Sequence, residues 1–89
     1  MSIADRIRDK LTEAFAPMEL SVEDESAKHA GHSGARPGGE THFRVRIVAD
    51  VFASMNRVER QRRVYAVLAD EMNDRVHALA LTVSAPGEP

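Results

Sequence analysis

The sequence predicts an α+β fold, a single small domain whose elements follow the order helix, strand, strand, helix, strand. Three observations support this order. Apolar residues recur every three or four positions near the N-terminus and again between residues 57 and 74, residues 41–49 alternate between apolar and polar, and residues 76–83 form a nearly continuous apolar run. The predicted sheet is three-stranded and mixed, with helices covering one face. A chain of 89 residues is long enough for one such domain.

The first helix is predicted between two boundary signals. Ser2 is a suitable N-cap, with Asp5 three positions later, and Pro17 ends the helix because the residue before a proline avoids helical torsion angles. The face between these signals is apolar and contains Ile3, Ile7, Leu11, Ala14 and Phe15. Alternation over residues 18–23 then predicts the first strand.

The second strand, residues 41–49, is predicted to have one covered and one solvated face. Phe43, Val45, Ile47 and Ala49 lie on the first, and His42, Arg44 and Arg46 lie on the second. Asn56 is a suitable N-cap for a helix that extends to residues 73–74, and residues 76–83 form the third strand. A strand–helix–strand crossover makes the last two strands parallel. Residues 1–84 thus form the domain, and residues 85–89 a disordered tail.

A long segment, residues 25–40, joins the first two strands and is expected to be a flexible loop rich in histidine and glycine. It contains four glycines and Pro37, which rule out regular secondary structure. Hairpin loops usually have ~2–5 residues, and structureless loops beyond ~12–15 residues are either functional or disordered. The presence of His29 and His32 makes this segment a candidate for function.

The composition excludes several classes of function. The chain has no cysteine, so it cannot supply a disulfide, a thiol nucleophile or a thiolate ligand. A net charge of −2 and an aromatic content of 4% disfavour a general polyanion binder or a stacking platform for single strands. No nucleophile–base pair, phosphate loop or catalytic carboxylate pair is recognisable, so no enzyme is expected. The N-terminal residues lack an apolar stretch, which predicts a cytoplasmic protein without signal peptide or membrane span.

The predicted topology gathers the histidines at one edge of the sheet. Parallel strands begin at the same edge, so His77 should lie where residues 25–40 enter the second strand. His77 alternates with Leu79 and is expected on the helix-covered face, whereas His42 is expected on the opposite face. We therefore pair His77 with the loop histidines, His29 and His32, and leave His42 out of the candidate site.

Neutral imidazoles without thiolates favour two kinds of metal centre. Zinc accepts three histidines with a water or a carboxylate, which this chain has the residues to supply. A [2Fe–2S] cluster accepts two histidines on one iron when cysteines hold the other, and those cysteines would have to come from a partner. Both alternatives are open from the residues alone.

The chain resembles the BolA-like proteins over almost its whole length. The matching residues are Leu20, Val22, 24–26, His29, 31–32, 39–43, Val45, 47–48, Phe52, Arg60, Arg62, Val64, Tyr65, Leu68, Glu71 and 76–79. The resemblance implies a compact fold similar to the type II KH domain. It also implies a non-enzymatic role in iron–sulfur cluster trafficking or in iron and redox regulation.

The resemblance further implies a partner and a cofactor. The partner is a monothiol glutaredoxin, which with glutathione holds one side of a shared [2Fe–2S] cluster. By position, His77 is the C-terminal histidine ligand of this family, and His29 or His32 is the ligand from the variable loop. The isolated chain is expected to bind no cofactor and to be a monomer or a weak homodimer.

A second hypothesis is a nucleic-acid-binding transcriptional regulator, since some BolA-like proteins are described as transcription factors. The residues that would contact DNA are the arginines of the second helix, Arg57, Arg60, Arg62 and Arg63. Acidic residues lie close to them, no Gly-x-x-Gly clamp is present, and the net charge is negative. The sequence therefore favours the glutaredoxin partner over DNA.

Overall fold

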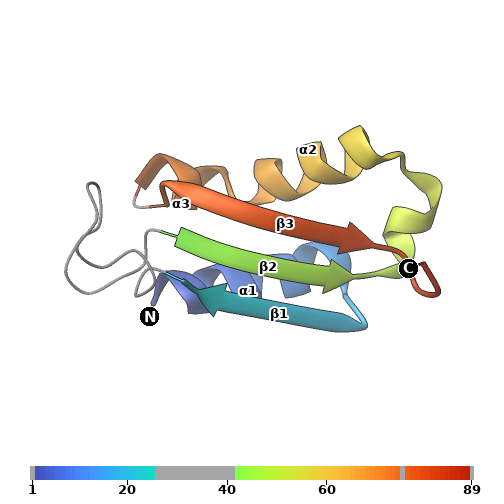
Figure 1. Ribbon diagram of the computed structural model, residues 1–89, viewed down its shortest axis with the longest axis horizontal. Helices are drawn as coiled ribbons and strands as arrows, with labels where there is room; N and C mark the ends of the chain where they lie inside the picture. The colour runs from blue at the N-terminus through green and yellow to red at the C-terminus, as the bar shows by residue number, and fades with distance from the viewer. Residues whose placement is uncertain (1, 26–41, 75, 89) are drawn as a thin grey trace.

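The computed structural model describes residues 2–25, 42–74 and 76–88 and shows the predicted order of elements (Figure 1). The elements are α1 (Ile3–Phe15), β1 (Glu19–Asp24), β2 (His42–Val48), the 3-10 helix η2 (Asp50–Ser54), α2 (Arg57–Val67), α3 (Ala69–Asp74) and β3 (Ala78–Ser84). No helix in these ranges is long and apolar enough to cross a membrane.

The three strands form one mixed sheet in the order β1-β2-β3. β1 pairs antiparallel with β2, so that Leu20 lies opposite Ile47. β2 pairs parallel with β3, so that Phe43 lies opposite Leu79 and His42 opposite Ala78. The predicted α+β class and the mixed sheet are confirmed.

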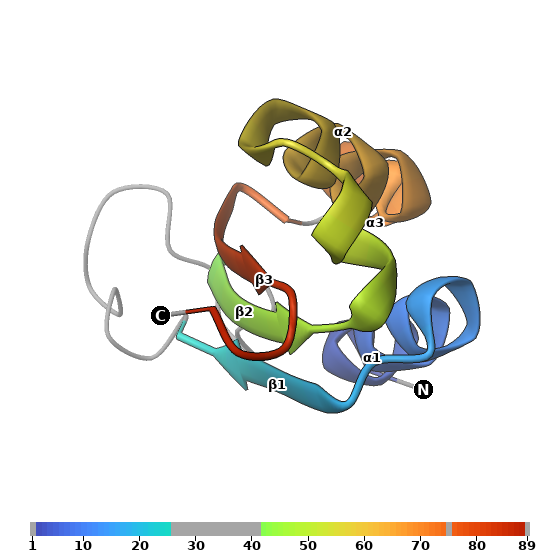
Figure 2. The same ribbon diagram turned by 90° about the vertical axis from the view of Figure 1, so that its right-hand side faces the viewer.

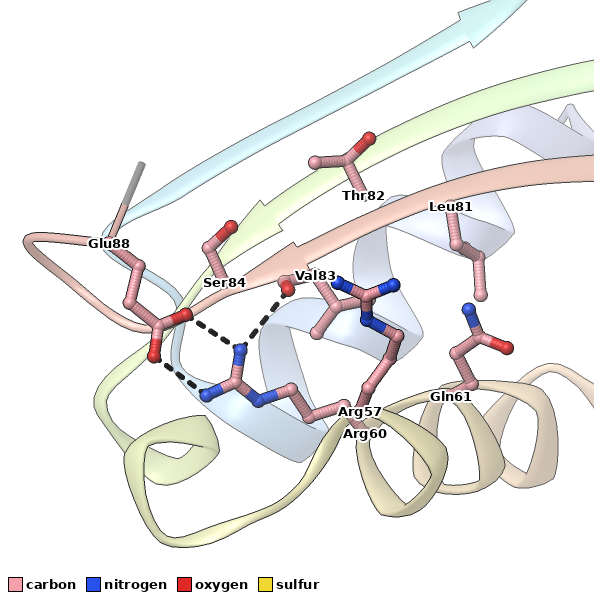
Figure 3. A pocket seen from close by; sticks show the side chains of 8 residues that line it. All are labelled: Arg57, Arg60, Gln61, Leu81, Thr82, Val83, Ser84 and Glu88. Atoms are coloured by element: carbon pink, nitrogen blue, oxygen red, sulfur yellow. Dashed lines mark hydrogen bonds and ion pairs between the residues drawn. The ribbon is translucent and has the colours of Figure 1, made fainter.

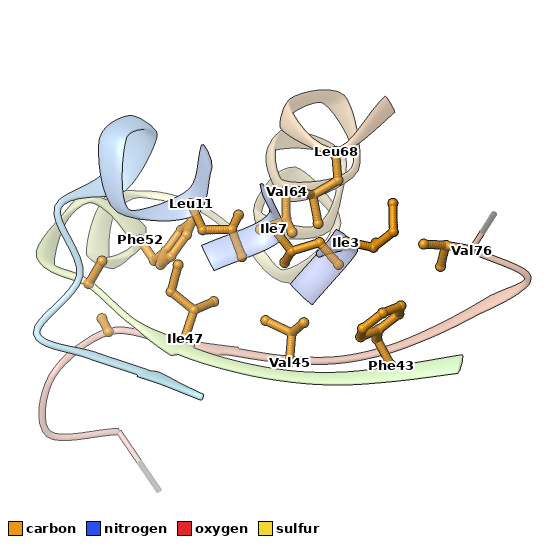
Figure 4. Packing of buried hydrophobic residues seen from close by; sticks show 12 residues of the cluster. Ile3, Ile7, Leu11, Phe43, Val45, Ile47, Phe52, Val64, Leu68 and Val76 are labelled. Atoms are coloured by element: carbon orange, nitrogen blue, oxygen red, sulfur yellow. The ribbon is translucent and has the colours of Figure 1, made fainter. Parts of the chain in front are cut away.

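The described helices lie together on one face of the sheet (Figure 2). The core between the sheet and the helices contains Ile3, Ile7 and Leu11 of α1 and the inward residues of β2, as predicted (Figure 4). Ala14, which was predicted on the same face of α1, is exposed. Its fully buried members include Ile7, Leu11, Phe43, Val45, Ile47, Phe52, Val64 and Leu68. Burial of each large apolar side chain is worth about 1.5–3 kcal/mol, which fixes the register of β2.

Both predicted N-caps are confirmed. The Ser2 Oγ accepts the backbone N–H of Asp5 at 3.1 Å, and the Asn56 Oδ1 accepts that of Glu59 at 2.8 Å. Each bond satisfies a backbone donor that has no partner inside its helix. At the other end of α1, Ala16 adopts left-handed torsion angles (φ 45°) just before Pro17, and its N–H donates to the Thr12 carbonyl.

The second helical region is divided in two, whereas the sequence predicts one helix. Leu68 has φ −100° and ψ 18°, which ends α2, and α3 begins at the next residue. The break brings α3 against α1, where Glu71 is fully buried. Arg6 Nη2 lies 2.8 Å and Lys10 Nζ lies 2.9 Å from Glu71 Oε2. Burial would raise the pKa of Glu71, but the hydrogen bond from Lys10 and the two positive charges outweigh it and lower that pKa.

The prediction of a disordered tail is wrong for residues 85–88. Ala85 is buried in the core, and Glu88 forms a bidentate ion pair with Arg60. Its Oε1 lies 2.7 Å from Nη1 and its Oε2 lies 2.8 Å from Nη2. Pro86 and Gly87 form a turn, in which Gly87 has φ +85° and the Glu88 N–H donates to the Ala85 carbonyl.

Candidate functional site

Two histidines meet at the edge of the sheet where β2 and β3 begin. His42 is the first residue of β2, and His77 directly precedes β3. Their imidazole rings are stacked, with centroids 6.4 Å apart and planes inclined by 14°. His77 is exposed and His42 is half-buried, so this histidine pair is open to a partner molecule.

The structure corrects two expectations about this edge. His77 is not on the helix-covered face, because β3 begins only at Ala78 and Val76 is the residue that points into the core. The strand alternation that placed His77 beside Leu79 therefore does not extend to it. His42, which sequence reasoning left out of the site, is the described histidine that lies next to His77. The register of the two parallel strands could have predicted that His42 lies beside His77, because His42 lies opposite Ala78.

The predicted loop ligands, His29 and His32, lie outside the described residues. The residues that flank their segment do lie at the histidine pair. The N–H of Glu25 donates to the carbonyl of His42 at 2.7 Å, and the Glu25 carboxylate accepts a bond from Arg44 at 3.1 Å. Glu25, the last described residue before this segment, and His42, the first after it, are therefore joined by a backbone hydrogen bond.

The histidine pair brings together two nitrogen donors of the kind that metal centres use. Among the residues with described positions, no group of three or more histidine, aspartate or glutamate side chains is arranged to hold a metal ion. Two imidazoles fit the histidine half of a [2Fe–2S] cluster or two positions of a tetrahedral zinc site. Either centre needs further ligands from residues 26–41 or from another molecule.

The arginines of the DNA hypothesis do not act as one cationic surface. The side chain of Arg60 is only 14% exposed, and its Nε donates to the carbonyls of Phe52 and Met55 at 3.0 and 3.1 Å. Arg63 Nη2 lies 3.4 Å from a carboxylate oxygen of Glu59 on the same helix, while Arg57 and Arg62 are exposed. Arg60 therefore holds the end of the chain in place and is unsuited to contact DNA.

The Arg60–Glu88 pair gives a prediction about pH. The hydrogen bonds from Arg60 and from the Ala85 N–H lower the pKa of Glu88 from 4.5 to about 2. Because the folded pKa is below the unfolded one, the stabilisation is complete above pH 4.5 and is lost as the pH falls toward about 2. A carbon-detected NMR titration should show this midpoint, and the midpoint should return toward 4.5 in Arg60→Gln. A normal midpoint in the wild-type chain would show that the pair is not formed in solution.

Comparison with known proteins identifies relatives of the whole domain. Residues 11–88 match the family model described as BolA-like protein. An uncharacterised Sinorhizobium protein encoded in the cobS 5′ region is 48% identical over 90 residues, covering 100% of this chain and 97% of the relative. The DNA-binding transcriptional regulator BolA of Escherichia coli is 43% identical over 81 residues, which cover 91% of this chain and 73% of that protein.

Solved structures agree with the fold. The BolA domain of SufE1 from Arabidopsis thaliana superposes with a TM-score of 0.86 at 44% identity, covering 100% of this chain and 98% of the other. BolA1 from the same plant gives a TM-score of 0.83 at 41% identity, with coverage of 97% and 94%. Some relatives are much longer, since the match spans only 24% of the full Arabidopsis SufE-like protein 1 and 54% of its chloroplastic BOLA1.

Proposed function

Because this chain belongs to the BolA-like protein family, we propose that it is a non-enzymatic partner of a monothiol glutaredoxin. In this proposal the two proteins share a [2Fe–2S] cluster that is also held by glutathione, and the pair acts in cluster trafficking or in iron and redox regulation. The observation that carries the proposal is the exposed His77 ring, stacked on His42 at the edge of the sheet where β2 and β3 begin.

The donor atoms of the chain support a cluster whose ligands come from both proteins and glutathione. Without cysteine, the chain offers no thiolate ligand, so the thiolates must come from the glutaredoxin and glutathione. His77 is exposed and directly precedes β3, an outer strand of the sheet, where a partner can approach without displacing the core. His29 or His32 would provide the second imidazole. When bound, such a cluster has a higher reduction potential than one held only by thiolates.

The proposal is tested by titrating the chain into a monothiol glutaredoxin loaded with a cluster and glutathione. The visible absorption and circular dichroism should change and reach saturation at one chain per cluster, because imidazole replaces a ligand of the iron. The same titration into glutaredoxin without a cluster provides the baseline. A cluster spectrum that stays constant to a large excess of the chain would contradict the proposal.

A second candidate function is transcriptional regulation through DNA, which is favoured by the names of the Escherichia coli and Haemophilus influenzae relatives. The exposed Arg57 and Arg62 are the helix residues best placed to contact phosphates. Each lost phosphate contact reduces the slope of log K against log salt by about 0.9, so Arg62→Gln should flatten it by that amount. Arg60→Gln is a poor probe because it frees the end of the chain. Absence of duplex binding by the wild-type chain at low salt would exclude this function.

A further inference from the structure

A small polar pocket lies at the end of β3, at the opposite end of the sheet from the histidine pair (Figure 3). It has a volume of about 320 Å³ and lies between the first turns of α2 and the end of β3. The side chains that matter for its chemistry are Arg57, Arg60, Gln61, Thr82, Ser84 and Glu88. Ligand pockets usually measure about 300–1,000 Å³, so this one has room for one or two side chains of a partner.

Arg60 is a preformed receptor for a carboxylate in this pocket. Its Nε is held by two backbone carbonyls and its Nη1 also donates to the Val83 carbonyl at 3.4 Å, while Nη1 and Nη2 are directed at the two oxygens of Glu88 (Figure 3). A guanidinium fixed in this way binds a carboxylate through two parallel hydrogen bonds. The backbone contacts of Arg60 do not involve Glu88, so the receptor keeps its orientation when that carboxylate leaves.

The resident carboxylate is attached to the rest of the protein by few contacts. Glu88 belongs to the last turn of the described chain, and its side chain is 38% exposed. Besides Arg60, it accepts one bond from the N–H of Ala85 at 3.0 Å, and its own N–H donates to the Ala85 carbonyl at 3.2 Å. Release of Glu88 therefore requires only that this turn opens, while Ala85 stays buried in the core.

A second cation faces the same pocket. Arg57 extends from α2 toward β3 (Figure 3), and within residues 2–25, 42–74 and 76–88 it has no acidic partner. The pocket thus contains two guanidinium groups and a single carboxylate, which leaves one positive charge uncompensated. The hydroxyl groups of Thr82 and Ser84 line it as further hydrogen-bonding groups.

We propose that this pocket binds an acidic segment of a partner protein, with one carboxylate replacing Glu88 on Arg60 and a second pairing with Arg57. The C-terminal turn is then a built-in competitor that occupies the receptor until such a segment arrives. The seated Glu88 itself shows that the pocket accepts a carboxylate. Duplex DNA does not fit as well, because the side chain of Arg60 is only 14% exposed.

The test uses the full chain and an acetylated, amidated Gly-Glu-Glu-Gly peptide, with Gly-Gln-Gln-Gly as the neutral control. NMR titration should shift the amides of Thr82 and Ser84 with the acidic peptide only. Glu88→Gln removes the competitor and should tighten binding by about tenfold. Arg57→Gln, which leaves the Arg60–Glu88 pair intact, should weaken binding about two- to fivefold.

Arg62→Gln is the matched control, because it removes the same charge from the same helix outside the pocket and should leave the affinity for the peptide unchanged. An equal loss in Arg57→Gln and Arg62→Gln would overturn the proposal, since binding would then depend on overall charge. Unchanged affinity in a folded Glu88→Gln would overturn it as well. If inorganic phosphate displaces the acidic peptide at an equal concentration, the pocket is a general oxyanion site and the assignment to an acidic segment is wrong.

Discussion

Replacing His77 by alanine is expected to abolish the spectral change that the chain produces in a cluster-loaded monothiol glutaredoxin. His77 is the proposed imidazole ligand from the sheet edge, and an alanine side chain has no donor atom to replace it. The fold should be retained, because His77 is exposed and such substitutions usually change stability by less than about 0.5 kcal/mol. Visible circular dichroism of the mixture, with thermal unfolding of the isolated variant, measures both effects.

His42→Ala is the matched control for His77→Ala. This substitution removes the other imidazole of the pair. In our proposal, His42 supports the His77 ring without binding iron. The spectral change should therefore persist, with affinity reduced less than in His77→Ala. His29→Ala and His32→Ala, measured separately, identify the ligand from residues 26–41. If His42→Ala abolishes the change and both of these variants keep it, the second ligand is His42.

Replacing Glu71 by alanine is expected to destabilise the protein by about 3 kcal/mol. The Glu71 carboxylate is buried between α1 and α3, where it accepts hydrogen bonds from Arg6 and Lys10 at 3.1 and 3.0 Å. Removing one partner from a buried ionic network costs about 3–5 kcal/mol. We expect the lower end of that range, because the side chains of Arg6 and Lys10 are 34% and 35% exposed and can regain water. Urea denaturation monitored by circular dichroism gives the free energy of unfolding.

The neighbouring Asp70 provides the control. Asp70 also lies near Lys10, at 3.5 Å, but its side chain is 83% exposed, so Asp70→Ala should change stability by less than about 1 kcal/mol.

The loss of unfolding free energy caused by Glu71→Ala should become smaller at acidic pH. The pKa of Glu71 is lowered in the folded state, so its ionic contribution is complete above pH 4.5 and is lost as the pH falls through the folded pKa. Equal effects of the two substitutions would show that the Glu71 network is not a special source of stability.

Much of the fold was predictable because it depends on local patterns. The N-caps Ser2 and Asn56 and the alternation of β2 each involve residues within a few positions of one another. The helical break at Leu68 was not predictable in this way, since apolar positions continue through it at helical spacing.

The candidate site was predictable only in part. The edge at which His77 lies follows from the parallel pairing of β2 and β3, and the structure places it there. The closeness of His42 to His77 was not predicted, because the alternation of β3 was extended to His77, which precedes the first residue of that strand. The residues that would complete the site, His29 and His32, remain predictions from the resemblance to BolA-like proteins.

The sequence by itself determined the order of elements, the topology of the sheet and the class of ligands that this chain can offer, because these depend on local periodicity, a short crossover and the absence of cysteine. The tertiary structure alone decided which charged groups meet. Glu71 binds Arg6 across 65 positions, and Glu88 binds Arg60 across 28. No local pattern encodes such pairs, since their partners become neighbours only when the helices and the final turn pack together.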